Sequence, residues 1–191
     1  MRVIAGTCRS LRLKTPPGAD VRPTTDRIKE TLFNIISARV PGSDFLDLFC
    51  GCGAIGIEAL SRGAASSVFV DSSDTSIRYT RENLEFTKLI DRAEIIRSDA
   101  AGAISRLFVE GKRFDVIFMD PPYSKELERR VLEELSNFNL LKEDGTIIIE
   151  AKSDTDFSYV SGLGFEITRE KLYGSNKHMF ISISEEGKSK D

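Results

Sequence analysis

The chain has 191 residues, of which 40% are hydrophobic and 30% charged, and its formal net charge at pH 7 is −3. This size fits one α/β domain with a short extension, and the composition is that of a globular protein, not a disordered one. No apolar run approaches the roughly 18 residues of a transmembrane helix, and the N-terminus lacks a signal-peptide pattern, so we expect a cytoplasmic protein.

The N-terminal segment is strongly basic. Residues 1–29 contain seven basic and two acidic residues, a local charge of +5 that leaves the rest of the chain at −8. Residues 2–5 and 11–14 bracket a turn near Gly6 and are predicted to form a small β-hairpin. Because a phosphate backbone attracts a basic extension, this hairpin is predicted to contact nucleic acid; chance clustering on a solvated face is the alternative. The predicted contact residues are Arg2, Arg9, Arg12 and Lys14.

Behind the hairpin, a helix is predicted from Thr24 because apolar residues follow it at helical spacing up to Pro41-Gly42. Strand and helix signals then alternate, which predicts βαβ crossovers and a mostly parallel sheet with helices on both faces. The predicted strands are residues 45–49, 67–71, 93–98, 114–120 and 146–150, and the predicted helices are residues 54–62, 74–88, 101–110 and 126–136. Residues 164–173 and 179–184 are predicted to form a closing hairpin around the turn-forming loop 174–177.

The first of these strands leads into a glycine-rich loop, Gly51-x-Gly53-x-x-Gly56, at the start of a helix. Such a loop lets a ligand approach the backbone and offers free N–H groups at the helix N-terminus. The spacing fits a nicotinamide dinucleotide site equally well, and a glycine turn without function is a further alternative.

Three acidic residues narrow the choice of ligand. Asp71 closes the second strand, where an acid can accept both hydroxyls of an adenosine ribose, and Asp99 follows the third, where an adenine amino group could be held. Asp47 precedes the glycines, where a carboxylate would repel a pyrophosphate and attract a cation. S-adenosylmethionine carries an ammonium group, a ribose and an adenine and would satisfy all three acids. Taken singly, each acid could equally cap a helix or end a solvated strand.

The three cysteines, Cys8, Cys50 and Cys52, are an odd number in a chain without an export signal, so no disulfide framework is expected. With His178 as the single histidine, the Cys50-Gly51-Cys52 segment lacks the partners of a four-ligand zinc site. The cysteines are therefore predicted to pack as small side chains, and no metal is expected.

The fourth strand runs into an acid, two prolines and an aromatic ring in the segment FDVIFMDPPY, residues 114–123. In a doubly wound sheet of order 3-2-1-4-5, this end would lie beside the glycine loop at the topological switch. Asp120 and the Pro121 carbonyl could each accept an N–H of a nucleobase amino group, which would aim the nitrogen lone pair at a methyl carbon. Pro121 and Pro122 fix φ, and Tyr123 can stack on a flipped base.

These motifs resemble class I S-adenosylmethionine-dependent methyltransferases. The chain is most similar to the bacterial family that methylates the exocyclic N2 of one guanine in 16S ribosomal RNA of the small subunit. The resemblance covers nearly the whole chain and rests on four segments: RVIAGTCRSLRLKTP, RPTTDRIKETLFNII, FLDLFCGCGAIGIEALSRGA and FDVIFMDPPY. It implies a Rossmann-like, doubly wound α/β sheet of seven strands, mostly parallel, with a C-terminal antiparallel hairpin and a small N-terminal β-hairpin extension. It also implies a basic RNA-contacting hairpin at 1–23, a methyltransferase domain at 24–186 and a frayed tail at 187–191.

The resemblance also assigns roles to residues. Asp120, Pro121, Pro122 and Tyr123 would hold the guanine. The partner would be 16S rRNA or a small-subunit assembly intermediate, and the chain is expected to act as a monomer. Ser10 stands where relatives usually have glycine, a departure that concerns the turn of the hairpin and not its charge. The implied cofactor residues are Arg22, Pro23, Thr24, Asp47, Phe49, Gly51, Gly53, Asp71, Asp99 and Ala100.

Three alternatives use some of the same features. A DNA amino-methyltransferase shares the DPPY chemistry but usually needs a sizeable recognition domain, and only about 44 residues precede the sheet here. A protein-glutamine methyltransferase typically has Asn-Pro-Pro-Tyr where this chain has Asp120. A non-catalytic nucleoside-sensing module would need neither Asp120 nor Tyr123.

Overall fold

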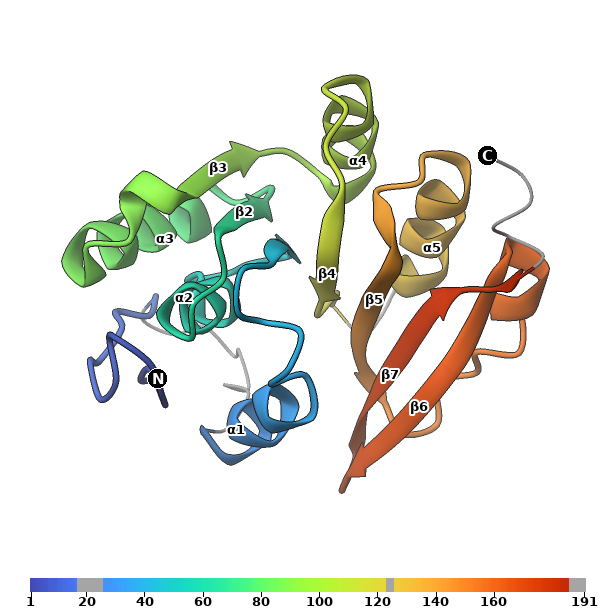
Figure 1. The fold of residues 1–191 in the computed structure, drawn as a ribbon, viewed down its shortest axis with the longest axis horizontal. Helices are drawn as coiled ribbons and strands as arrows, with labels where there is room; N and C mark the ends of the chain where they lie inside the picture. The colour runs from blue at the N-terminus through green and yellow to red at the C-terminus, as the bar shows by residue number, and fades with distance from the viewer. Residues whose placement is uncertain (17–25, 123–125, 186–191) are drawn as a thin grey trace. The chain divides into compact units, whose positions relative to one another are not determined.

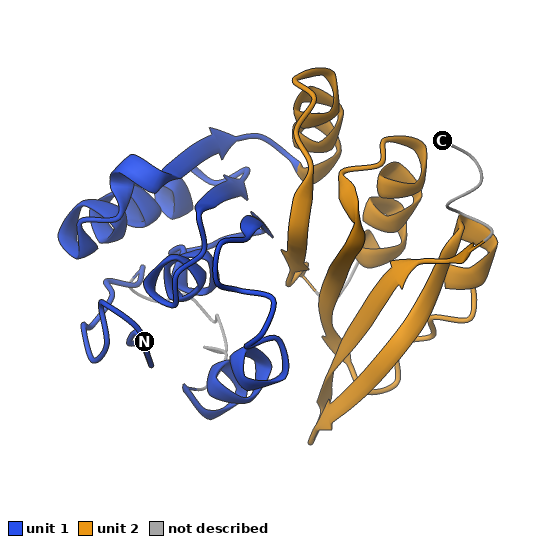
Figure 2. Cartoon of the chain, viewed as in Figure 1, with its two compact units in different colours: residues 1–99 blue, residues 100–191 orange. Residues whose placement is uncertain are grey.

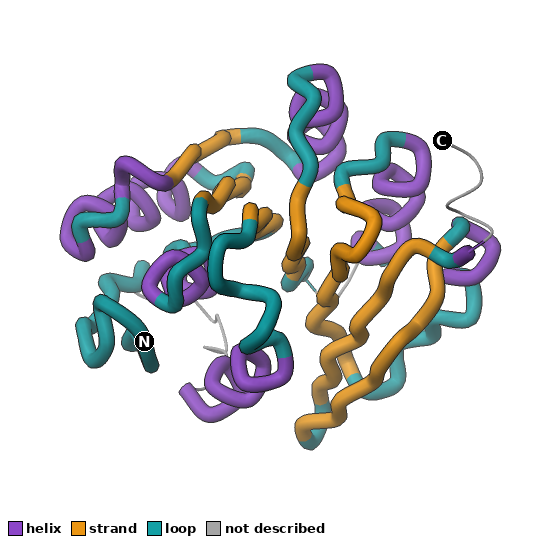
Figure 3. Tube along the Cα trace, in the orientation of Figure 1, coloured by secondary structure: helices purple, strands orange, loops and turns teal. Residues whose placement is uncertain are grey.

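The structure is a computed structural model that describes residues 1–16, 26–122 and 126–185 (Figure 1). The chain forms two compact units, residues 1–99 and 100–191 (Figure 2). Helices alternate with strands along most of the chain, and the last two strands follow one another directly (Figure 3). Within the described ranges, no helix is both long and apolar enough to span a bilayer.

The first unit contains a parallel three-stranded arrangement in which β2 pairs with both β1 and β3. The residue ranges are α1 Asp26–Ile35, β1 Asp44–Leu48, α2 Ala54–Ser61, β2 Ser66–Asp71, α3 Asp74–Thr87, the 3₁₀ turn η1 Ile90–Arg92 and β3 Ala93–Arg97. Helix α2 packs on β1 and β2, and α3 packs on β2 and β3. All eight residues of α2 are buried, so this helix lies at the centre of the unit.

Local sequence explains the ends of α3, the longest helix of the first unit. Ser73 adopts an extended conformation, and its hydroxyl accepts a hydrogen bond from Ser76 N at 3.4 Å, as an N-cap residue does. Lys88 ends the helix in the left-handed conformation, with φ of 59°. Thr80, Asn83 and Thr87 are polar yet buried on one face of the helix, which matters for the site below.

The second unit contains the remaining strands in the order β4-β5-β7-β6. Its elements are α4 Ala100–Val109, β4 Phe114–Met119, α5 Leu127–Asn137, β5 Leu141–Lys152, the 3₁₀ turn η2 Val160–Leu163, β6 Phe165–Tyr173 and β7 Asn176–Ile183. Strand β5 runs parallel to β4, whereas β7 is antiparallel to both β5 and β6. The predicted α/β class, with mostly parallel strands and a closing antiparallel hairpin, is confirmed.

The predicted element boundaries needed four corrections. Helix α1 ends at Ile35 and not at the predicted Pro41-Gly42, because residues 36–39 form a turn in which Arg39 N donates to Ile36 O at 2.8 Å. Strand β5 begins at Leu141, because a bulge between Phe114 and Val116 lets Leu141 pair with Phe114 ahead of the main register. The closing hairpin turns over two residues, since Tyr173 already pairs with Asn176, and not over the predicted four. The N-terminal hairpin contains one isolated antiparallel bridge, between Arg2 and Arg12, instead of two regular strands.

The N-terminal hairpin is nevertheless ordered by backbone hydrogen bonds. Val3 N donates to Leu11 O at 2.9 Å, and Ser10 N donates to Val3 O at 2.8 Å. Ser10 has φ of 71°, the left-handed conformation that favours glycine, and it is the position at which the family resemblance implies a glycine. The irregular segment 5–10 contacts the C-terminal end of α2, where Thr7 N donates to Ser61 O at 2.9 Å.

Candidate functional site

Three residues of the glycine-rich loop between β1 and α2, spaced two apart, have positive φ. Phe49, Gly51 and Gly53 have φ values of 64°, 57° and 80°. A Cβ atom built on Gly51 would have no heavy atom within 4 Å, so the backbone is open to a ligand on that side. Positive φ at Phe49 is strained for a side chain with a Cβ atom, and such residues occur preferentially at ligand sites.

Gly56 has a different role from the loop glycines. A Cβ atom there would lie 2.3 Å from the Phe69 ring and 2.8 Å from Ser67 Oγ, both on β2. Glycine is therefore required for α2 to approach the sheet closely, the role expected of the third glycine of this motif.

Asp47 lies in β1 directly below the loop and is 1% exposed. Its Oδ2 accepts a hydrogen bond from Gly56 N, in the first turn of α2, at 2.9 Å. The pKa of Asp47 is raised to about 7, mainly by burial and to a smaller extent by the neighbouring Asp71 charge, while the Gly56 hydrogen bond acts in the opposite direction. The carboxylate thus occupies the helix N-terminus at which an anionic ligand would otherwise bind.

Asp71 ends β2, and two backbone donors fix its carboxylate. Gly51 N donates to Oδ2 at 2.9 Å, and Ser73 N donates to Oδ1 at 2.8 Å. A carboxylate has about four acceptor positions, so each oxygen keeps capacity for another donor, such as a ribose hydroxyl.

Asp99 follows β3 and is exposed, and Ala100 is the buried first residue of α4. The ends of β2 and β3 are tied together, because Ser98 N donates to Asp71 O at 3.1 Å. Of the three acids predicted to hold the cofactor, Asp47 therefore lies within β1, Asp71 ends β2 and Asp99 follows β3 by two residues.

The three cysteine thiols are free and buried. Burial raises the pKa of Cys50 and of Cys52, and the Asp47 charge raises both further, so both thiols stay protonated at neutral pH. Cys8 Sγ donates to Thr87 O at 3.4 Å on α3. These thiols pack as small side chains between the loop, the hairpin and α3.

Sequence reasoning missed the residues of α3 that hold the loop. Thr80 Oγ1 donates to Gly51 O at 3.0 Å, and Asn83 Nδ2 donates to Cys52 O at 2.9 Å. The available signal was the polar residues at positions 80, 83 and 87 on the face that also carries buried Leu84.

The predicted acceptor segment begins where β4 ends. Asp120 follows Met119 and is partly buried, Pro121 is buried and Pro122 is exposed. Tyr123 lies outside the described residues, as do Arg22, Pro23 and Thr24 of the cofactor prediction and the tail 187–191.

The basic side chains of the hairpin are exposed, whereas Val3 and Leu13 between them are buried. Arg2 Nε pairs with Asp26 Oδ2 at 2.7 Å, and Lys14 Nζ pairs with Glu82 Oε2 at 2.8 Å. The Lys14 pair raises the pKa of Lys14 and lowers the pKa of Glu82, mainly through the hydrogen bond between them. Arg9 and Arg12 form no side-chain hydrogen bond or ion pair within the described ranges.

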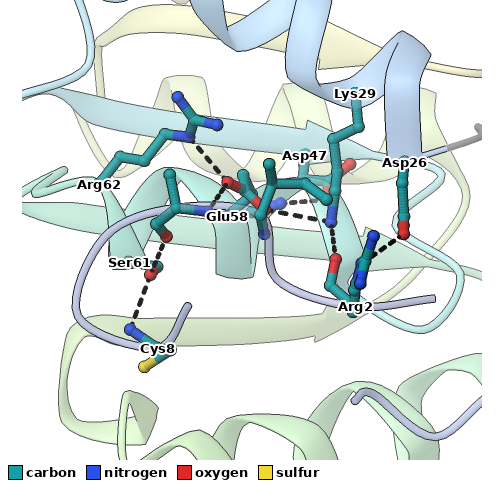
Figure 4. A network of polar contacts seen from close by, with 11 residues as sticks. Arg2, Cys8, Asp26, Lys29, Asp47, Glu58, Ser61 and Arg62 are labelled. Carbon is teal, nitrogen blue, oxygen red and sulfur yellow. Dashed lines mark hydrogen bonds and ion pairs between the residues drawn. The ribbon is translucent and has the colours of Figure 1, made fainter. Parts of the chain in front are cut away.

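One basic residue of this segment does not contribute to its surface charge. Lys29 on α1 is fully buried, and its Nζ lies 3.1 Å from Glu58 Oε2 and 2.6 Å from Arg2 O (Figure 4). Glu58 also accepts hydrogen bonds from Ile4 N and Ala5 N and pairs with Arg62 Nε at 2.7 Å. A buried ion-pair network thus fastens the hairpin to α1 and α2. Its sequence signal was a lysine on the same helical face as Leu32 and Phe33.

A family model described as "Conserved hypothetical protein 95" matches residues 1–182. The chain belongs to this family. It is 37% identical over 174 residues to "Putative rRNA methyltransferase YlbH" of Bacillus subtilis, covering 91% of this chain and 94% of the relative. It is 30% identical over 189 residues to "Ribosomal RNA small subunit methyltransferase D" of Escherichia coli, covering 99% of this chain and 93% of the relative.

A solved structure supports the same family assignment. The structure named "Putative methyltransferase yhhF from Escherichia coli" matches with a TM-score of 0.85 and 29% identity, covering 96% of this chain and 98% of that chain. The resemblance to small-subunit rRNA methyltransferases is therefore confirmed, and so is the methyltransferase fold. Both of the relatives named above carry rRNA methylation in their names.

Proposed function

We propose that this protein transfers a methyl group from S-adenosylmethionine to the exocyclic N2 amino group of a guanine in 16S ribosomal RNA. The relatives named as ribosomal RNA methyltransferases support the RNA substrate, and the glycine loop supports the cofactor. The finer assignment of N2 and guanine rests on the family resemblance together with the Asp120-Pro121-Pro122-Tyr123 sequence.

The observation that carries the cofactor assignment is the buried carboxylate of Asp47. In a dinucleotide site, the first turn of the helix after the glycines binds a pyrophosphate. Here Gly56 N in that first turn already donates to Asp47, whose pKa of about 7 leaves it partly ionised at neutral pH, so an anionic ligand would meet an occupied donor and a negative charge. A cofactor with an ammonium group in place of the pyrophosphate is compatible with this arrangement.

The described residues fit the rest of that cofactor. Gly51 leaves its outer side open, and Asp71 holds an oriented carboxylate with acceptor capacity for two hydroxyls. Asp99 and Ala100 would hold the adenine, and Arg22, Pro23, Thr24 and Phe49 are proposed to complete the site. When bound, S-adenosylmethionine supplies an electrophilic methyl group on a positively charged sulfur.

Asp120 and Pro121 are proposed to hold the acceptor. A guanine amino group is a weak nucleophile because its lone pair is delocalised into the ring. Asp120 Oδ and the Pro121 carbonyl would each accept one N–H, which turns the nitrogen lone pair outward, and the proline torsion keeps that carbonyl direction fixed. The proton released from nitrogen would pass to Asp120 or to water. Tyr123 would stack on the base.

The exposed basic hairpin is proposed to hold the RNA backbone. Arg2 lies opposite Arg12 in the antiparallel bridge and pairs with Asp26. Arg9 and Arg12 offer exposed guanidinium groups that pair with no described residue, and a phosphate backbone would pair with them. The partner would be 16S rRNA, either free or in a small-subunit assembly intermediate, and the protein would act as a monomer.

Replacing Asp120 tests the proposal. Asp120→Ala is expected to lower methyl transfer at least about 100-fold, the scale of losing one positioned catalytic group, while S-adenosylhomocysteine binding stays within about twofold of wild type. Asp115→Ala is the matched control, because Asp115 lies on β4, the strand that leads to Asp120, and pairs with Lys142. Full activity of Asp120→Ala would rule out this acceptor assignment.

A further inference from the structure

We infer that Asn83 couples the basic hairpin to the cofactor loop, so that RNA and cofactor strengthen each other's binding. This inference rests on the proposed function, because it takes the hairpin as the RNA contact and the loop as the cofactor contact. Asn83 would be a positioning residue that touches neither ligand.

The side chain of Asn83 joins the two segments directly. Its Nδ2 donates to Cys52 O in the glycine loop at 2.9 Å and to Lys14 O in the hairpin at 3.0 Å. Its Oδ1 accepts from Lys14 N at 2.8 Å. The residue is fully buried, so these hydrogen bonds have no water to replace them.

The chemistry of the three partners fits an asparagine side chain. Two backbone carbonyls need donors and one backbone N–H needs an acceptor, which a single planar primary amide supplies from one position. An aspartate would lack the donors, and a leucine would leave all three backbone groups unpaired. Lys14 and Cys52 are 69 and 31 residues from Asn83 in sequence, and α3 joins the two through this one side chain.

Two further hydrogen bonds on the same side of α3 join this helix to the glycine loop and to the hairpin. Thr80, almost one turn before Asn83, donates to Gly51 O, and Thr87, one turn after it, offers its carbonyl to Cys8 Sγ. Lys14 also pairs with Glu82, the residue before Asn83, but this pair is exposed on both sides and contributes little. The buried amide of Asn83 therefore sets the position of the Lys14 backbone relative to the loop.

The coupling between RNA binding and cofactor binding follows from the free-energy cost of ordering the hairpin and the glycine loop. RNA bound at Arg12 and Lys14 would fix the hairpin backbone at Lys14 and, through Asn83, the Cys52 carbonyl of the loop. A cofactor that binds afterwards meets a loop whose ordering cost has already been met, so its affinity rises. By linkage, the cofactor raises RNA affinity by the same factor.

The test measures that factor. The dissociation constant of S-adenosylhomocysteine is determined with and without small-subunit particles that lack the modification, and the ratio of the two constants is the coupling. Wild type is expected to give a ratio of about 5 or more, the lower range of allosteric couplings, and Asn83→Ala a ratio within about twofold of one. If Asn83 only stabilised the fold, Asn83→Ala would weaken S-adenosylhomocysteine binding equally with and without the particles, and the ratio would stay at its wild-type value.

Ser43→Ala is the matched control, because Ser43 is also buried and its hydroxyl donates to Val40 O at 2.8 Å, a contact that involves neither the hairpin, the glycine loop nor α3. It is expected to keep the wild-type ratio. A wild-type ratio of one, or a wild-type ratio retained in Asn83→Ala, would overturn the inference even where methyl transfer proceeds. If the particles neither bind nor accept methyl groups, the proposed function fails and the inference fails with it.

A second measurement on the wild type is independent of whether the variant folds. Amide hydrogen exchange in the loop peptide, residues 49–56, is expected to slow when RNA binds in the absence of cofactor. Unchanged exchange in this peptide, with RNA bound, would contradict the coupling.

Discussion

Asp47 is the residue whose ionisation distinguishes this site from an ordinary glycine turn. Its pKa is raised from 3.8 to about 7, chiefly by burial, so the folded protein holds a proton there that the unfolded chain has lost. Between these two pKa values, the folded state binds more protons than the unfolded state. Asp47 therefore contributes stability that is fully present below about pH 4 and is lost as the pH rises through about 7.

Asp47→Asn removes this pH dependence, because the amide oxygen can still accept from Gly56 N but carries no charge. The stability of the variant relative to wild type is expected to increase from about pH 4 to about pH 7 and then to level off. Urea unfolding at a series of pH values measures the difference. A stability difference that is flat across this range would contradict the raised pKa.

Ser10 provides a second prediction at the residue scale. Its φ of 71° places a Cβ atom in the left-handed region, which costs a residue other than glycine roughly 1–2 kcal/mol. Ser10→Gly is therefore expected to be more stable than Ser10→Ala by about 1 kcal/mol. Thermal unfolding of the two variants makes the comparison, and equal melting temperatures would mean that the turn is not strained at this residue.

At the scale of elements, the hairpin is held by the buried ion pairs of Lys29 and Arg62 with Glu58. Lys29→Met leaves the Glu58 carboxylate buried without its lysine partner and is expected to cost about 3–5 kcal/mol of unfolding free energy. Arg27→Met, an exposed position on the same helix, should change stability by less than about 0.5 kcal/mol. Denaturant unfolding measures both variants.

Adding Glu58→Gln to Lys29→Met should recover part of the loss, because the unpaired buried charge is gone, although the single glutamine oxygen can replace only one of the two carboxylate oxygens that accept from Ile4 N and Ala5 N. If Lys29→Met lies within about 1 kcal/mol of wild type, the network does not anchor the hairpin.

The RNA-contacting role of the hairpin is tested through salt. Arg9→Ala combined with Arg12→Ala is expected to weaken RNA binding and to lower the slope of log affinity against log salt by up to about two. Arg129→Ala is the control, since Arg129 is similarly exposed but lies on α5 and pairs with Glu133. An unchanged slope in the double variant would remove the hairpin from the RNA interface.

Hydrophobic periodicity predicted most elements within a few residues, because each strand and helix follows from its own sequence. It did not predict the β5 bulge at Phe114 or the two-residue turn at Tyr173, which depend on how neighbouring strands pair. The irregular hairpin has the same cause: buried ties to Glu58 and Ser61 shape it, and these residues are more than fifty positions away.

At the scale of the whole molecule, the motifs on the strands could be assigned from sequence, but the side-chain hydrogen bonds and ion pairs that join distant segments could not. The glycines and acids carry recognisable spacing. Asn83, Thr80 and Lys29 do not, since a polar residue on a buried helix face has many possible partners until the tertiary contacts are known. The family match over residues 1–182 supports the overall assignment without locating these contacts.

The most direct test of the proposed function is transfer of labelled methyl from S-adenosylmethionine to protein-free 16S rRNA and to small-subunit particles that lack the modification. Nucleoside analysis of the product then identifies the methylated atom. The proposal predicts that the label appears in N2-methylguanosine in at least one of these two substrates. No transfer to either substrate, or label confined to another nucleoside or to protein of the particles, would contradict it.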